Sequence, residues 1–140
     1  MKAPVEAPLF QGKPDRVNTP AWLQYYQQIE DSARPVKQLL TLLNGVTNYG
    51  GAYESASFIR QADGLIVLSG LVNLPVGYTL NVTPIAMLPA GCRPAACHTF
   101  AAESFNAYGR IDIRSDGSIV AMVGAVGRWI SLSATFVAEQ

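Results

Sequence analysis

Closely spaced turn residues between Leu42 and Val72 constrain the fold of this chain more than any other sequence feature. Asn44-Gly45 and Gly50-Gly51 are pairs in which the backbone adopts a positive φ at low cost. Asp63-Gly64 is typical of a tight β-hairpin turn, and it precedes the apolar, β-branched run of residues 65–68, which is typical of a buried strand. This segment therefore predicts short strands joined by tight turns.

The rest of the chain from residue 36 onward follows the same pattern. Apolar runs alternate with Gly, Asp and Pro at spacings near ten residues, which favours an antiparallel β-sandwich or jelly roll over a helical fold. The predicted strands are Val36–Leu43, Ala52–Arg60, Leu65–Val72, Thr79–Val82, Ala95–Glu103, Ala107–Arg114, Ser118–Val123 and Trp129–Ala138.

Two of the predicted turns share a local pattern. Residues 60–67 and 114–120 each place an arginine before an Asp-Gly pair and Ile-Val after it. The pattern predicts two hairpins with the same turn. Two copies are fewer than the three or more that a repeat architecture needs, so the similarity indicates shared hairpin chemistry and not a solenoid or propeller.

Residues 1–35 differ in character from the β-rich remainder, residues 36–140. Three prolines, Pro4, Pro8 and Pro14, remove backbone donors from residues 1–19, where few apolar residues are available for a core, so this part is predicted to be an extended arm. Thr19 is an N-cap candidate, and Pro20 suits the first helical position. These signals predict one short helix over residues 20–33, which ends before Pro35.

The predicted helix carries an apolar stripe. Its members recur at steps of three and four residues, and they are Trp22, Tyr25, Tyr26, Ile29 and Ala33. A helix of about fourteen residues is marginal alone, so the stripe must pack against something. Two interpretations remain open: the stripe covers the chain's own β-domain, or it meets another polypeptide.

Composition limits the classes of partner. The chain is 49% hydrophobic and 14% charged, below the usual fraction of about a quarter, which favours surfaces buried between subunits. Ten basic and ten acidic residues cancel without clustering, so neither nucleic acid nor an anionic membrane is expected as a partner. The N-terminal residues lack the apolar core of a secretory signal, and no apolar run is long enough to cross a membrane. We therefore expect no membrane insertion, and a cytoplasmic location unless a larger assembly carries the chain out.

Catalytic and metal-binding patterns are weak. His98 is the single histidine, and no Gly-x-Ser-x-Gly nucleophile motif accompanies it. Cys92, Cys97 and His98 lack the spacing and the fourth ligand of a structural zinc site, so two reduced, buried thiols are expected. No metal, cofactor or catalytic residue is predicted.

The acidic residues do not predict a glycosidase. Asp63 and Asp116 are accounted for by their Asp-Gly turns. Nothing in the spacing of Glu54, Glu103 and Asp112 indicates that two carboxylates converge as glycoside hydrolysis requires. We therefore expect that the protein is not an enzyme.

Aromatic residues near the predicted loops are better candidates for ligand contact. Aromatic rings stack on sugar rings while amide and guanidinium groups hydrogen-bond sugar hydroxyls. The candidates for saccharide contact are Tyr49, Tyr53, Asn106, Tyr108 and Arg110. The alternative is that these loop residues pack against a neighbouring subunit.

Four segments together resemble a known family. They are residues 42–72, Leu88-Pro-Ala-Gly-Cys-Arg-Pro94, Ala107-Tyr-Gly-Arg-Ile-Asp-Ile113 and Trp129-Ile-Ser-Leu-Ser133. In this order they resemble the compact C-terminal β-domain of bacteriophage tail fibres and related virion appendage proteins. The resemblance implies a homotrimer whose β-domain forms an outer knob.

Three functional hypotheses follow. The first is a virion structural protein, a short trimeric fibre, spike or tip that presents a β-knob to a host surface and its saccharides. The second is a capsid decoration or cement protein that stabilises the shell, and the third is a carbohydrate-binding module. Under the first two, the chain is assembled in the host cytoplasm and joins other virion proteins of the tail, the portal region or the capsid. The residues expected at the trimer or virion interface are Pro4, Pro8, Phe10, Trp22, Tyr25, Tyr26 and Ile29.

Overall fold

The computed structural model describes residues 20–26 and 35–139, which belong to two units, residues 1–34 and 35–140. In the first unit, residues 21–26 are helical, and the amides of Leu23 and Gln24 both donate to the Pro20 carbonyl at 3.1 Å. This agrees with the predicted start of the helix. Its predicted continuation over residues 27–33 and the predicted arm over residues 1–19 lie outside the described residues.

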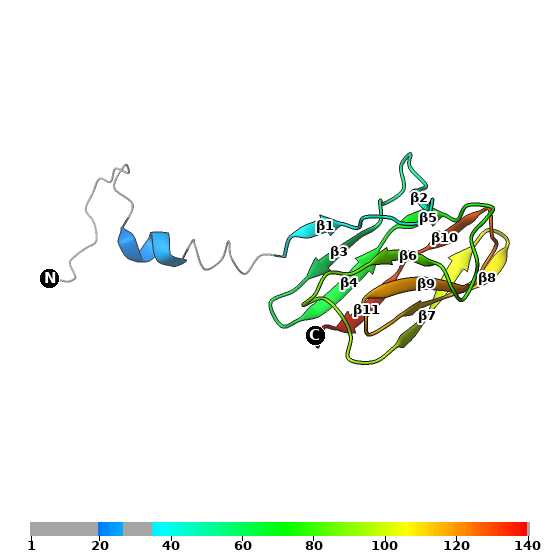
Figure 1. Ribbon diagram of the computed structural model, residues 1–140. Coiled ribbons are helices and arrows are strands. Elements are labelled where there is room, and N and C mark those ends of the chain that lie inside the picture. The colour runs from blue at the N-terminus through cyan, green and yellow to red at the C-terminus, as the bar shows by residue number, and fades with distance from the viewer. Residues whose placement is uncertain (1–19, 27–34, 140) are drawn as a thin grey trace, which may run out of the picture. The chain divides into compact units, whose positions relative to one another are not determined.

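The second unit is a sandwich of two antiparallel sheets, which confirms the predicted fold class (Figure 1). The first sheet has the strand order β1 (Lys37–Leu39), β3 (Ser57–Arg60), β4 (Leu65–Ser69) and β11 (Ala134–Val137). The second has the order β2 (Thr47–Asn48), β5 (Leu71–Asn73), β10 (Trp129–Ser131), β7 (His98–Ser104), β8 (Ala107–Ile113), β9 (Ser118–Val123) and β6 (Pro84–Met87).

Alternation along the strands forms the hydrophobic core. In β4, Ile66 and Leu68 are fully buried while their neighbours are only partly buried, as expected for one face turned toward the opposite sheet. Ile111 from β8 and Ile130 from β10 are also fully buried. Large branched side chains from both sheets thus fill the space between them.

The two Asp-Gly hairpins have the same turn, as predicted. In the β3–β4 turn, the amide of Leu65 donates to Asp63 Oδ1 at 3.1 Å, and in the β8–β9 turn the amide of Ser118 donates to Asp116 Oδ1 at 2.9 Å. Gly64 and Gly117 follow with φ of 90° and 92°. A side-chain cap followed by a left-handed glycine therefore closes both hairpins.

Several predicted strand limits require correction. Residues 65–72 form two strands because Gly70 interrupts them, and residues 129–138 likewise divide into β10 and β11. The strands predicted over residues 36–43, 52–60 and 95–103 are observed as the shorter or shifted β1, β3 and β7. The pairing of β2 with β5 was not predicted.

The prediction of a strand over residues 79–82 was wrong. The amide of Thr83 donates to the Thr79 carbonyl at 3.0 Å and Asn81 has φ of 70°, so the segment is a turn, and β6 begins only at Pro84. The turn encloses Tyr78, whose hydroxyl donates to the Thr83 carbonyl and accepts from the Ala121 amide. The hydrogen bonds of this buried tyrosine stabilise the turn despite the β-branched residues around it.

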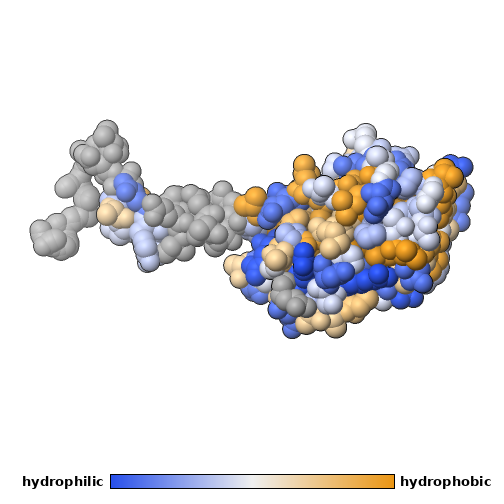
Figure 2. All heavy atoms as spheres, in the orientation of Figure 1, coloured by the Kyte–Doolittle hydropathy of each residue, from blue (hydrophilic) through white to orange (hydrophobic). Residues whose placement is uncertain are grey.

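Apolar residues also reach the surface of the β-domain. Val36, just before β1, and Leu39, within it, are 65% and 72% exposed, and hydrophobic atoms are visible over this edge in Figure 2. Within the residues that the structure describes, no helix has the length and apolar character needed to cross a bilayer.

Candidate functional site

The backbone passes from one sheet to the other at two neighbouring places. β4 of the first sheet ends at Ser69 and β5 of the second begins at Leu71, while β10 of the second sheet ends at Ser131 and β11 of the first begins at Ala134. The Leu132 amide donates to the Gly70 carbonyl at 2.7 Å and joins the two crossings. We refer to residues 69–71 and 131–133 as the seam.

Gly70 is required at the seam. Its φ is 136°, and an added Cβ would lie 2.5 Å from the Cα of Ala56 and 2.8 Å from the Ala56 amide nitrogen. A side chain at this position would therefore be strained and would collide with backbone. The close approach allows the chain to leave β4, turn past Ala56 and enter the other sheet within one residue.

A cleft of about 430 Å³ lies over the seam. This volume is within the range of small-molecule sites. The lining combines aromatic rings, two carboxylates and three serines from several strands. Its residues are Tyr49, Tyr53, Glu54, Ser69, Gly70, Leu71, Glu103, Trp129, Ser131, Leu132 and Ser133. We call this site the seam cleft.

Two tyrosines form a right-angled corner at one side of the seam cleft. The rings of Tyr49 and Tyr53 have centroids 5.1 Å apart and planes at 88°. The loop that carries them is short and pinned: the Tyr49 amide donates to the Leu71 carbonyl at 2.9 Å, and the Ala56 amide donates to Asn48 Oδ1 at 2.8 Å. Two successive glycines at positive φ, residues 50 and 51, reverse the chain between the rings.

The two carboxylates of the seam cleft have different surroundings. Glu54 forms an ion pair with Lys37, and the hydrogen bond from Lys37 lowers the pKa of Glu54 below its usual value. Glu103 is exposed on β7; its backbone amide donates to Ser131 Oγ at 3.0 Å. Among the described residues, the Glu103 carboxylate takes part in no hydrogen bond or ion pair.

Strand register extends this surface across the second sheet. Ser131 pairs with Leu71, and Glu103 pairs with Tyr108. Because Ile130 pairs with Ser104 in antiparallel register, the next residues, Ser131 and Glu103, are also neighbours. One outward row therefore crosses β5, β10, β7 and β8. Three strand spacings amount to about 14 Å. A second hollow of about 260 Å³ shares Glu103, Ser131 and Ser133 with the seam cleft and continues it along β7.

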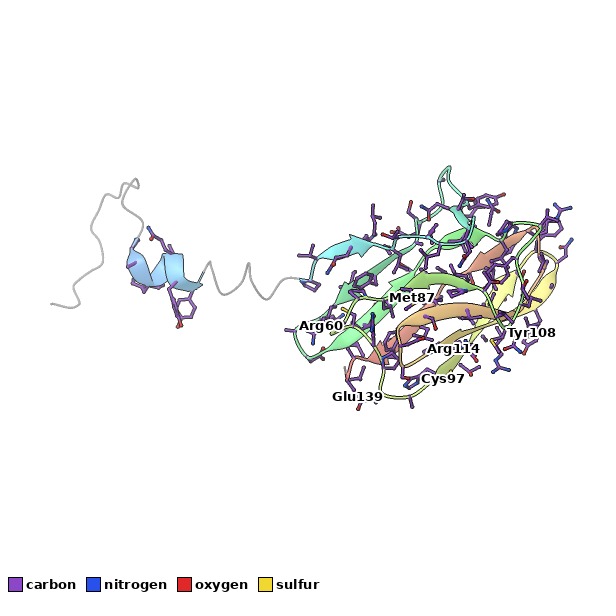
Figure 3. The ribbon with its side chains drawn as sticks, viewed as in Figure 1. Arg60, Met87, Cys97, Tyr108, Arg114 and Glu139 are labelled. Carbon is purple, nitrogen blue, oxygen red and sulfur yellow. The ribbon has the colours of Figure 1, made fainter. Side chains whose placement is uncertain are left out.

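The predicted saccharide residues fall into two groups. Tyr49 and Tyr53 line the seam cleft. Tyr108, at the far end of the outward row, is 69% exposed, and Asn106 occupies the β7–β8 turn with φ of 49°. Figure 3 labels Tyr108 at the end of the domain opposite to Arg60.

Arg110 is already engaged within the domain. Its Nε and Nη2 donate to the two carboxylate oxygens of Asp112, both at 3.1 Å, and Nη2 also reaches Thr99 Oγ1 at 3.4 Å. The hydrogen bond to Asp112 raises the pKa of Arg110. Because both oxygens of Asp112 hold the guanidinium, Arg110 orders the outer face of β8 more than it offers donors to a ligand.

Sequence reasoning missed Trp129 and Glu103 as partners of the tyrosine corner. The sequence predicted Trp129 only as part of a strand motif, and Glu103 only as one of several acidic residues. Their sequence positions lie 50 to 80 residues beyond the tyrosines, and the register of β10 with β5 and β7 brings them together. Period-two alternation was the available signal, because it places both side chains on the outward face.

The predicted interface residues are described in part. Trp22, Tyr25 and Tyr26 are 64%, 63% and 59% exposed, and the rings of Trp22 and Tyr26 meet edge to face at 6.2 Å. Pro4, Pro8, Phe10 and Ile29 lie outside the described residues.

The cysteines and the histidine form no metal cluster within the described residues. Cys92 is buried as expected, but Cys97 is exposed, which corrects the prediction of two buried thiols; both are free. Cys97, labelled in Figure 3, lies just before the start of β7. The His98 ring stacks against Phe100 and Phe136, with centroids 6.1 and 6.2 Å away, so it acts as a packing residue.

Comparison with known proteins gives a similarity at the level of structure. No protein-family model matches the sequence, and a search of curated proteins finds no match. Among solved structures, the chain is similar to the crystal structure of the receptor-binding protein gp15 of Listeria phage PSA. The TM-score is 0.66 with 19% sequence identity, over 86% of this chain and 74% of that one. At this identity the similarity shows a shared fold.

Proposed function

We propose that this chain is a structural protein of a bacteriophage virion, a short fibre, spike or tip whose β-domain attaches to the host surface. One observation carries the proposal: the β-sandwich is shared with a phage receptor-binding protein over 86% of the chain. The seam cleft supports it, because aromatic faces beside serine hydroxyls are suited to sugar rings. The proposal is saccharide binding without hydrolysis.

We propose further that the protein is a homotrimer anchored through residues 1–35 to another virion protein of the tail, the portal region or the capsid. Trp22 and Tyr25 on the helix, and Val36 and Leu39 beside and on β1, are large exposed side chains that association would remove from water. A closed cyclic assembly buries such surfaces without leaving an open end. Synthesis and assembly would then take place in the host cytoplasm.

Glu54 and Glu103 line the same cleft, so a hydrolytic role needs consideration. A glycosidase requires one carboxyl that stays protonated near neutral pH, usually through burial in apolar surroundings. Here Lys37 lowers the pKa of Glu54, and Glu103 is exposed. Neither carboxylate lies in a buried apolar pocket, and this favours binding over catalysis.

The proposed attachment role is tested with fluorescently labelled full-length protein on a panel of bacterial strains. We expect saturable staining of some strains, and competition by their purified cell-wall polysaccharide. Absence of staining on every strain, including the strain that the phage encoding this chain infects, would contradict the attachment role.

The place of the protein in the particle needs a separate measurement. Gold-labelled antibodies against residues 36–140 are expected to mark the tail end of particles that carry this gene. Label distributed over the shell would instead support a capsid decoration or cement protein, and particles without any label would leave a free carbohydrate-binding module.

A further inference from the structure

We propose that the seam cleft selects saccharides that carry a protonated amine, such as amino sugars without an N-acetyl group. This inference rests on the proposed attachment function and gives its ligand a chemical class. The amine would lie between the tyrosine corner and the Glu103 carboxylate, while the sugar ring covers the seam.

The charge of the lining favours a cationic ligand. The seam cleft has two carboxylates and no basic side chain among its lining residues. Lys37 already neutralises Glu54, so Glu103 contributes an unbalanced negative charge. An anionic ligand would be repelled by this charge, and a neutral one would gain nothing from it.

Two further basic groups of the described residues are engaged elsewhere. Arg110 is held by Asp112, and the Arg128 guanidinium lies 4.4 Å from the centroid of the Phe105 ring. Neither lines the cleft. The negative charge of Glu103 is therefore available to a cation that arrives with the ligand.

The tyrosine corner favours an ammonium group. Two rings at 88° present one face and one edge to the same space, and both tyrosines are exposed, Tyr49 by 44% and Tyr53 by 60%. Ammonium groups are attracted to aromatic faces, and the Glu103 carboxylate lines the same cleft. An N-acetyl group would place a neutral amide where this attraction acts.

The hydroxyl groups and the length of the groove indicate that a sugar carries the amine. Ser131 Oγ accepts a hydrogen bond from the Glu103 amide, so its own proton remains free to be donated, and Ser133 adds a further hydroxyl. The Ser69 hydroxyl also lines the cleft and lies 3.4 Å from Ser57 Oγ. The second hollow continues the groove toward Ala101 on β7. An extended, hydroxyl-lined groove suits a short oligosaccharide better than a small isolated amine.

The test compares two ligands that differ only at nitrogen, the tetramer of glucosamine and the tetramer of N-acetylglucosamine. Isothermal titration with full-length protein at about pH 6, where the amine is protonated, should give about tenfold tighter binding of the glucosamine tetramer. Added salt should weaken this ligand more than the acetylated one, because the preference is electrostatic.

Variants assign the preference to the cleft. Glu103→Gln should reduce the preference for the glucosamine tetramer to about twofold or threefold, since the carboxylate is lost and the tyrosine corner remains. Tyr53→Ala should weaken both ligands. Glu139→Gln removes the same charge from an exposed acid near the C-terminus, at the other end of the domain from Tyr108 in Figure 3, and should keep the full preference. Circular dichroism checks that each variant retains its β-sheet.

Equal affinity for the two tetramers, or a preference that Glu103→Gln leaves unchanged, would overturn the inference. Cell staining separates this failure from failure of the attachment role. If wild type, Glu103→Gln and Tyr53→Ala stain cells equally, attachment stands and the cleft assignment is wrong. If no strain is stained while the Glu103-dependent preference is present, the cleft chemistry stands and the attachment role is wrong.

Discussion

At the scale of single residues, Gly70 has the largest structural consequence. We expect Gly70→Ala to destabilise the β-domain by about 2 to 4 kcal/mol, because the new Cβ would meet the backbone of Ala56 and the φ of 136° would become strained. Urea unfolding followed by circular dichroism measures this loss.

Gly77→Ala is the matched control for that substitution. Apart from the adjacent residues, no atom would lie within 4 Å of a Cβ added at this position, so the stability of the domain should change by less than about 0.5 kcal/mol. Similar effects of the two substitutions would mean that the seam tolerates a side chain and that Gly70 has no special role.

Tyr78 is the second residue with a specific structural role. Tyr78→Phe should cost about 1 to 3 kcal/mol, because it leaves the Ala121 amide and the Thr83 carbonyl without their partner in a buried place. Tyr108→Phe, which removes a hydroxyl from an exposed ring, should change the free energy of unfolding very little. Thermal unfolding of both variants gives the comparison.

Tyr78 also gives the domain an alkaline pH dependence. Burial raises the pKa of Tyr78 above its ordinary value, so the folded state holds this proton more tightly than the unfolded state does. The stability that this proton contributes is fully present below about pH 10 and decreases as the pH rises through the pKa of Tyr78 in the folded state. Stability measured between about pH 8 and 11 should therefore fall less steeply for Tyr78→Phe than for wild type. Parallel slopes would contradict the role of burial.

At the scale of elements, the two Asp-Gly hairpins allow a matched comparison. Gly64 and Gly117 have almost the same φ, but a Cβ on Gly117 would lie 2.6 Å from the Leu88 carbonyl oxygen, whereas one on Gly64 would have its nearest neighbour at 3.6 Å. Gly117→Ala should therefore cost about 1 to 2 kcal/mol more than Gly64→Ala. Equal losses in urea unfolding would show that backbone strain alone determines both positions.

The same elements show how far sequence predicts this fold. The strand at residues 118–123 and the Asp-Gly turns were predicted correctly, because their signals are local. The break at Gly70 was not predicted, since the apolar run continues through it and the cause is contact with Ala56, fourteen residues earlier. The turn around Tyr78 was missed for a similar reason, because its partner Ala121 is distant in sequence.

The candidate site was predicted to a similar degree. Loop aromatics identified Tyr49 and Tyr53, since glycine-rich turns between polar segments indicate exposed rings. Period-two alternation places Glu103 and Trp129 on an outward face, but only strand register brings them beside the tyrosines. Register depends on pairing between distant segments, so their place in the cleft could not be predicted locally.

At the scale of the whole molecule, the apolar stripe of the helix decides between self-association and a local role. If the protein is the proposed homotrimer, light scattering at micromolar concentration should give three times the chain mass of 15.0 kDa. Trp22→Ala should then weaken association by about 3 kcal/mol or more and leave the melting temperature of the β-domain unchanged. Val76→Ala, at an apolar position outside the helix that is 86% exposed, is the control.

A monomer mass for wild type would remove the trimer from the proposal. Unchanged association of Trp22→Ala with a lower melting temperature would show that the helix covers its own sheet. In that case the anchor of the proposed virion protein would have to lie elsewhere in the chain.

The seam separates the frame of the cleft from its chemistry. Its frame is backbone, held by the bond between Leu132 and Gly70 and by the close approach of Gly70 to Ala56. Tyr53 and Glu103, in contrast, project from this frame into solvent and contribute little to the core. Substitutions at such side chains leave stability nearly intact, so the lining can diversify by single steps while the fold is conserved. A surface of this kind is evolvable, and a change of ligand preference requires no change of architecture.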